Sequence, residues 1–131
     1  MPTPVFRLAS PKDIVQLIDL RVFMQEEVNN ITETQGSSDY REKLRSYFAQ
    51  AIPAGTYSSA VAEIDGKIVA ANGLVSYEKP PSLTGGIGKV GYVSNVYTHP
   101  KWRGQGIATT LMQFLIEHAR QMGIDKRKHY V

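Results

Sequence analysis

The middle of the chain contains two runs rich in Val, Ile and Ala, joined by Asp65-Gly66. Residues 58–64 and 67–77 therefore predict a β-hairpin, because Asp-Gly supplies the backbone conformations that a two-residue turn requires. Residues 90–98 predict a further central strand, and residues 5–9 predict a short one. Helical patterns flank this β-rich centre on both sides, which predicts one sheet covered by helices.

Three segments carry apolar residues at helical spacing. The first begins at Ser10-Pro11, an N-cap residue followed by proline at the first helical position, and it ends before Asn29-Asn30. The second runs from Tyr40 to Ala51, and Pro53 ends it. The third runs from Ile107 to Met122, with apolar residues on two sides, and is therefore expected to be largely buried. The element order predicts a mixed α/β (α+β) fold in a single domain over residues 1–131.

Composition excludes several classes of protein. Hydrophobic residues make up 42% and charged residues 21%, which is typical of a globular chain rather than a disordered one. Cysteine is absent, so disulfides, cysteine zinc sites and thiol nucleophiles are excluded. The net charge of +3 is too small to indicate nucleic acid as a partner. With no apolar run near ~20 residues and no charged start followed by an apolar block, we expect no membrane association and a cytoplasmic location.

Two glycine patterns are candidate phosphate sites. Residues 86–91 match G-x-G-x-x-G, but a proline-rich loop precedes them and a β-rich run follows, so the dinucleotide interpretation lacks its context. Residues 103–108, Arg-Gly-Gln-Gly-Ile-Ala, lie between a strand and an amphipathic helix. The first turn of a helix has unpaired N–H groups and a partial positive charge, and glycines let an anion approach them. The alternative is a tight turn in which glycine has no binding role.

Residues 92–108 resemble the acetyl-CoA-binding motif of the GNAT superfamily of N-acetyltransferases. Arg103, Gly106 and Ala108 fill the fixed positions of its Q/R-x-x-G-x-G/A signature, with Thr98 and Pro100 in register. The element order is also similar to the family's from residue 5 to about residue 125. The resemblance implies a GNAT-like mixed sheet, mostly antiparallel, with flanking helices. It also implies acetyl-CoA as co-substrate and a primary amine of a small molecule or peptide as acceptor. We expect no metal, because the histidines lack neighbouring metal ligands in the sequence.

The resemblance assigns a path to the cofactor. Arg103 and the backbone of the helix start would hold the CoA diphosphate, the pantetheine arm would pair with the preceding strand, and the thioester would lie near Asn95-Val96, where the family has a β-bulge. The implied cofactor-binding residues are Val96, Tyr97, Thr98, Arg103, Gly104, Gln105, Gly106, Ile107 and Ala108.

No catalytic residue follows from the motif. Some family members use a carboxylate on the central strand as the base, but residues 92–96 contain none. Glu63, Glu78 and Asn95 are the candidates, and the two glutamates are equally interpretable as surface charges. Glu26 and Glu27 could attract a cationic acceptor or simply form an exposed helix end. His99 and His118 have no neighbouring metal ligands in the sequence.

The family pattern continues beyond residue 131, with a further helix and a last strand. We therefore expect a C-terminally shortened domain, truncated or completed by another subunit, with an exposed sheet edge that invites a homodimer. Residues 126–131 are more basic than a buried family strand. Three functions remain open: an N-acetyltransferase, a CoA-binding module with weak or no activity, and a basic adaptor that uses residues 120–128.

Overall fold

The computed structural model describes residues 3–30, 38–81, 83, 88–124 and 129–130. Part of the first glycine pattern and the basic residues 126–128 lie outside these ranges. The helices are α1 (Ile14–Asn29), α2 (Ser38–Ala54) and α3 (Ile107–Gln121), with short 3₁₀ turns at Pro11–Asp13 and Pro100–Trp102. The strands are β1 (Val5–Leu8), β2 (Tyr57–Ser58), β3 (Ala60–Ile64), β4 (Lys67–Glu78), β5 (Lys89–Thr98) and β6 (His129–Tyr130).

The described strands form one sheet in the order β1-β3-β4-β5-β6, with β2 pairing to β4. The predicted hairpin is confirmed: Asp65 and Gly66 have φ of 52° and 80°, the left-handed values that the turn requires, and β3 pairs antiparallel to β4. β6 pairs parallel to β5, through Tyr92–His129 and Val93–Tyr130. The sheet is therefore mixed and mostly antiparallel, as predicted.

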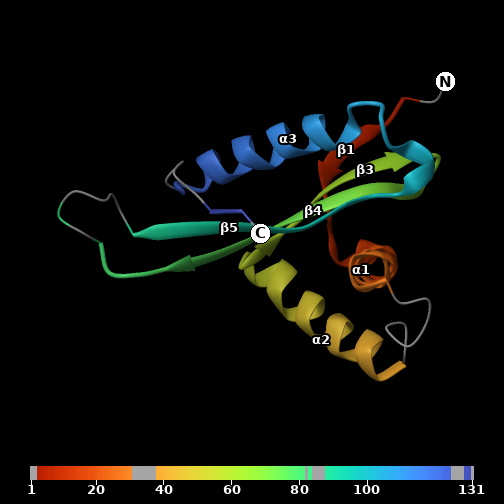
Figure 1. Ribbon diagram of the computed structural model, residues 1–131. Helices are drawn as coiled ribbons and strands as arrows, with labels where there is room; N and C mark the ends of the chain where they lie inside the picture. Colours follow the sequence, from red (N-terminus) through yellow and green to blue (C-terminus); the bar gives the residue numbers. More distant parts are fainter. Residues whose placement is uncertain (1–2, 31–37, 82, 84–87, 125–128, 131) are drawn as a thin grey trace.

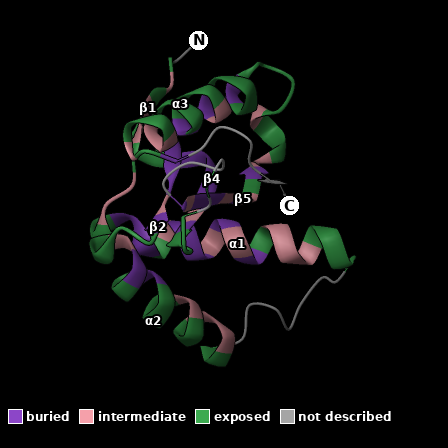
Figure 2. Cartoon of the chain, turned by 90° about the vertical axis from the view of Figure 1, so that its left-hand side faces the viewer, coloured by how far each residue is buried: buried purple, intermediate pink, exposed green. Residues whose placement is uncertain are grey.

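The helices cover both faces of the sheet. α3 lies on one face, and α1 and α2 lie on the other (Figure 1). Leu17, Ile18 and Phe48 belong to the core under α1 and α2, whereas Leu111 and Leu115 belong to the core under α3. Figure 2 shows the central strand β4 buried and much of α2 exposed. No helix in the described ranges is long and apolar enough to cross a membrane.

The expectation that α3 is buried on two sides is wrong. Its buried residues are Ile107, Leu111 and Leu115, all on the side that contacts the sheet. Phe114 and Ile116 are 36% and 40% exposed. The described part of the chain has no layer outside α3, so these two side chains remain at the surface, whereas Met112 and Ala119 are partly buried against the core.

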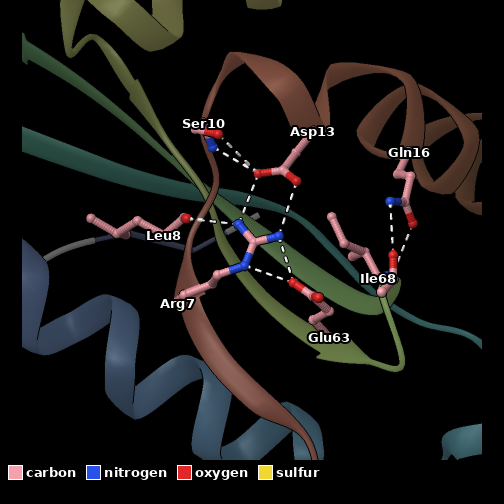
Figure 3. A network of polar contacts seen from close by, with 8 residues as sticks. Arg7, Leu8, Ser10, Asp13, Gln16, Glu63 and Ile68 are labelled. Carbon is pink, nitrogen blue, oxygen red and sulfur yellow. Dashed lines mark hydrogen bonds and ion pairs between the residues drawn. The ribbon is translucent and has the colours of Figure 1, made fainter.

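A polar cluster joins the N-terminal segment to the sheet (Figure 3). The Arg7 guanidinium donates to both Asp13 oxygens at 2.8 and 3.0 Å and contacts the Glu63 carboxylate at 2.7 Å. Asp13 also accepts the Ser10 N–H at 2.8 Å, so it completes the helix start that Ser10-Pro11 predicts. These hydrogen bonds hold the pKa of Asp13 below its usual range, chiefly through Arg7. The cluster ties β1, β3 and the start of α1 together.

Candidate active site

The central feature of the site is a β-bulge in β5. Ala71 of β4 lies opposite Tyr97 and Gly73 lies opposite Ser94, so Asn95 and Val96 share the single partner position of Asn72. Asn95 has a φ of 59°, a left-handed value that asparagine tolerates better than most residues. The bulge falls at the predicted position. β6 pairs with β5 only at residues 92–93, so among the described strands the edge from Ser94 to Thr98 has no partner opposite β4.

Asn72 fixes the bulge from behind. Its buried side chain accepts the Ala60 N–H at 3.1 Å and donates to the Leu111 carbonyl at 3.2 Å. Its own carbonyl accepts a hydrogen bond from the Ser59 hydroxyl at 2.7 Å. One residue therefore links β4 at the bulge to β3 and to α3.

The start of α3 presents unpaired backbone donors. The N–H groups from Gly104 to Thr109 have no acceptor within the described part of the chain, and Gly106, the N-cap residue, provides no side-chain cap. Gly104 and Gly106 have φ of 79° and 81°, and a Cβ built on either would meet no atom within 4 Å. Space above these donors is therefore open. Helix N-terminal donors beside open space are suited to an anion.

Arg103 lies beside these donors and is held by three groups. Its guanidinium contacts the Glu27 carboxylate at 2.9 Å, donates to the Thr98 carbonyl at 2.8 Å and lies 5.3 Å from the centre of the Tyr97 ring. The pKa of Glu27 is lowered, mainly because its carboxylate accepts a hydrogen bond from Arg103. Glu27 is at the end of α1, so this exposed ion pair joins α1 to the start of α3.

A cavity of about 490 Å³ lies over the start of α3. We call it the helix-start cavity. Predicted cofactor residues that line it are Val96, Tyr97, Thr98, Arg103, Gly104, Gly106, Ile107 and Ala108; Gln105 does not line it. The remaining lining residues are Met24, Glu27, Val28, Trp102 and Thr109. Met24 and Val28 escaped the sequence analysis because they come from α1, far from the motif, and only the tertiary fold brings them there.

A second cavity, of about 320 Å³, lies on the α1–α2 side of the bulge. We call it the aromatic cavity; its lining residues are Arg21, Leu44, Tyr47, Phe48, Tyr57, Val75, Ser94 and Asn95. The Asn95 amide donates to the Tyr57 hydroxyl at 3.0 Å, and burial raises the pKa of Tyr57 to about 12. The two cavities therefore meet β5 at consecutive residues, Asn95 and Val96. The sequence analysis missed Arg21 and Tyr57, which carry no local motif.

Gly73 makes room for Tyr57. A Cβ at Gly73 would lie within 2.7 Å of three atoms of the Tyr57 ring and hydroxyl. Since Tyr57 is buried against Tyr47 and Phe48, its ring has little freedom to move aside. We expect Gly73→Ala to lower the free energy of unfolding by about 1–3 kcal/mol, the usual cost of overpacking. Urea unfolding measures this change, and unchanged stability would show that Tyr57 can leave this position freely.

The catalytic candidates lie in different places. Glu63 is held in the Arg7–Asp13 cluster on β3, and Glu78 is exposed at the end of β4; neither lines the helix-start or the aromatic cavity. Asn95 lines the aromatic cavity at the bulge. His99 accepts the Lys101 N–H, and His118 lies 3.3 Å from the Ser58 hydroxyl. No cluster of three potential metal ligands occurs among the described residues.

Comparisons of sequence and structure relate the chain to known proteins. The sequence model of the acetyltransferase (GNAT) family matches residues 23–130, and the chain therefore belongs to this family. Membership implies acetyl transfer from acetyl-CoA. No curated protein matches the chain.

Solved structures share the fold. A predicted acetyltransferase from Clostridium acetobutylicum, crystallised with acetyl-CoA, has 29% identity and a TM-score of 0.82, covering 98% of this chain and 80% of that one. A GCN5-related N-acetyltransferase from Ralstonia eutropha JMP134 has 24% identity and a TM-score of 0.79, with coverage of 98% and 82%. Glucosamine-6-phosphate N-acetyltransferase from Arabidopsis thaliana has 23% identity and a TM-score of 0.71, with coverage of 98% and 80%.

Proposed function

We propose that this protein transfers the acetyl group of acetyl-CoA to a primary amine. The observation that carries the proposal is the run of N–H groups from Gly104 to Thr109, which lack an acceptor in the described part of the chain. They lie beside Arg103 and next to the edge of β5 that has no partner among the described strands. The N–H groups would bind the diphosphate, and the edge from Val96 to Thr98 would pair with the pantetheine arm. Gln105 contributes its backbone only.

The reaction is an acyl transfer. The neutral amine attacks the thioester carbonyl carbon, a C–N bond forms and the C–S bond breaks. The nitrogen loses one proton as the amide forms, and the departing CoA sulfur takes up one proton, so the step balances. The ammonium form of the acceptor must first release its proton to become nucleophilic. The carbonyl oxygen gains charge at the bulge, where a backbone N–H at Asn95-Val96 would stabilise it.

A second candidate function is CoA binding with little or no turnover. The observation that favours it is the aromatic cavity, which no carboxylate side chain of the described residues lines. The amine would then have to release its proton to solvent water before attack.

Self-association through the outer edge of β6, the last strand in the described sheet order, also remains a prediction.

Two measurements test these proposals. Calorimetric titration with CoA should show saturable binding, and release of free thiol from acetyl-CoA should accelerate when primary amines are added. Binding without amine-dependent thiol release would favour the second candidate. No binding of CoA at millimolar concentration would remove both.

The Arg103–Glu27 pair leads to a prediction about the cofactor. The Glu27 carboxylate competes with phosphate for the Arg103 guanidinium and repels a bound anion, so Glu27→Gln should tighten CoA binding by about twofold to fivefold at low salt. The gain should shrink at high salt. The matched control is Glu117→Gln, which removes the exposed partner of Arg120 on α3, away from the helix-start cavity. Weaker CoA binding in Glu27→Gln would show that Glu27 instead holds Arg103 in its binding position.

A further inference from the structure

We propose that the aromatic cavity binds the acceptor as a small amino-carboxylate with an apolar or aromatic body, an amino acid rather than a polyamine or a sugar. This inference rests on the proposed function and names its acceptor class. It follows from three features of the cavity: its walls, the one cation among its described lining residues, and the position of its polar groups at the bulge.

The walls are apolar and aromatic. The rings of Tyr47, Phe48 and Tyr57 contact one another, with centroids 5.3 to 5.7 Å apart. Leu44 and Val75 complete the apolar lining. A volume of about 320 Å³ is at the small end of the range for ligand sites, so it suits a small molecule with a hydrophobic body.

Arg21 gives the cavity a positive charge that no carboxylate of the described residues compensates. The other described arginines each have a carboxylate within 4.0 Å; they are Arg7, Arg41, Arg45, Arg103 and Arg120. Arg21 has no such partner in the described ranges, and its closest polar contact is a long hydrogen bond of 3.4 Å to the Asn95 side-chain oxygen. No acidic side chain among the described residues lines the cavity. A half-buried guanidinium without an anion favours a ligand that supplies one, and carboxylate matches its paired donors.

Tyr57 supplies a second donor to the same place. Its hydroxyl oxygen accepts from the Asn95 amide, while its own proton has no acceptor among the described residues. Burial raises the pKa of Tyr57 to about 12, so the hydroxyl keeps that proton at neutral pH. Since Arg21 and Tyr57 both contact the side chain of Asn95, the two donors lie on either side of one amide.

This position also places the amine. In an α-amino acid the nitrogen is bonded to the carbon that carries the carboxylate. A carboxylate held by Arg21 and Tyr57 therefore places the nitrogen beside the bulge, where the proposed thioester lies. The side chain of the acceptor then faces the rings of Tyr47 and Phe48. A polyamine would meet Arg21 with like charge, which disfavours it.

The test compares an acceptor with its decarboxylated counterpart. L-Phenylalanine and 2-phenylethylamine share the ring and the amine, and only the first has a carboxylate. We expect thiol release with kcat/KM at least about tenfold higher for L-phenylalanine, because a hydrogen bond between charged groups is worth about that factor. Arg21→Gln should lower kcat/KM for L-phenylalanine about tenfold and leave that for 2-phenylethylamine within about twofold.

The controls separate this inference from the proposed function. Arg45→Gln removes an exposed arginine of α2 that does not line the cavity, and it should leave both acceptors unchanged. Saturation-transfer NMR of L-phenylalanine with the CoA-loaded protein gives a readout without turnover, and Arg21→Gln should abolish it. Equal rates for both amines, or a preference for 2-aminoethyl phosphate, would overturn the inference while the acetyltransferase assignment stands. If no amine is acetylated, the proposed function fails, and the NMR signal alone still decides whether the site binds an amino-carboxylate.

Discussion

Gly106→Leu should weaken CoA binding by more than about a hundredfold, beyond detection in a calorimetric titration. The Cβ of residue 106 would extend into the open space over the start of α3, where the diphosphate is proposed to bind. A leucine there would separate the anion from several N–H donors, and each hydrogen bond to a charged group is worth about 1.5–3 kcal/mol. The loss of two such hydrogen bonds would already raise the dissociation constant by more than about a hundredfold.

Gly66→Leu is the matched control for Gly106→Leu. Gly66 has a φ of 80°, close to the 81° of Gly106, and a Cβ at either position meets nothing within 4 Å. Both substitutions therefore carry a similar strain of about 1–2 kcal/mol, so both variants should melt at similarly reduced temperatures. Only the change at position 106 should remove CoA binding. Equal CoA affinity in the two variants would refute the diphosphate site.

Asp13→Ala should lower the free energy of unfolding by about 2–3 kcal/mol, because it removes the charged hydrogen bonds between Asp13 and Arg7 while Glu63 remains as a partner of Arg7. The Asp13 side chain is 5% exposed, and it also accepts the Ser10 N–H at the start of the helix. The corresponding fall in melting temperature is about 10 °C. Thermal unfolding followed by circular dichroism measures it. The control is Asp39→Ala, which removes an exposed partner of Lys43 and should change little.

The same cluster predicts a pH dependence. Arg7 lowers the pKa of Asp13 in the folded protein, so the unfolded state binds the proton more readily. The stabilisation is present above the ordinary aspartate pKa of about 3.9 and is lost as the pH falls through the lower folded value. The wild type should therefore lose stability on acidification in this window, and Asp13→Ala should lose less. Parallel pH curves for the two proteins would contradict this account.

The helices and strands that could be predicted are those whose conformation depends on residues adjacent in the sequence. Asp65-Gly66 sets the hairpin through its own backbone angles, and the glycines at 104 and 106 mark the start of α3 in the same way. The bulge at Asn95 was predictable through the family resemblance, and the structure has it there. The helical stripes gave the positions of α1, α2 and α3, although periodicity alone could not tell which apolar stripe of α3 the sheet covers.

The parts that escaped sequence analysis depend on tertiary contacts. Glu63 was a candidate base, but its carboxylate pairs with Arg7, on a strand that only the fold brings beside β3. Glu27 was a candidate for attracting a cationic acceptor, but its carboxylate pairs with Arg103, which is 76 residues away in the sequence. Arg21 carries no signal in the sequence, because a single arginine in a helix is ordinary until its neighbours are known to lack a carboxylate.

The buried amide of Asn72 has a mechanical consequence. Its hydrogen bonds to Ala60 and Leu111 hold β3 and α3 to β4 at the bulge, and so set the separation between the two proposed contact regions of CoA, the bulge in β5 and the start of α3. The flexible pantetheine arm of CoA would therefore bind a site whose two ends are already in position before binding. Substitutions in α2, which lines the aromatic cavity but not the helix-start cavity, should therefore leave that spacing unchanged.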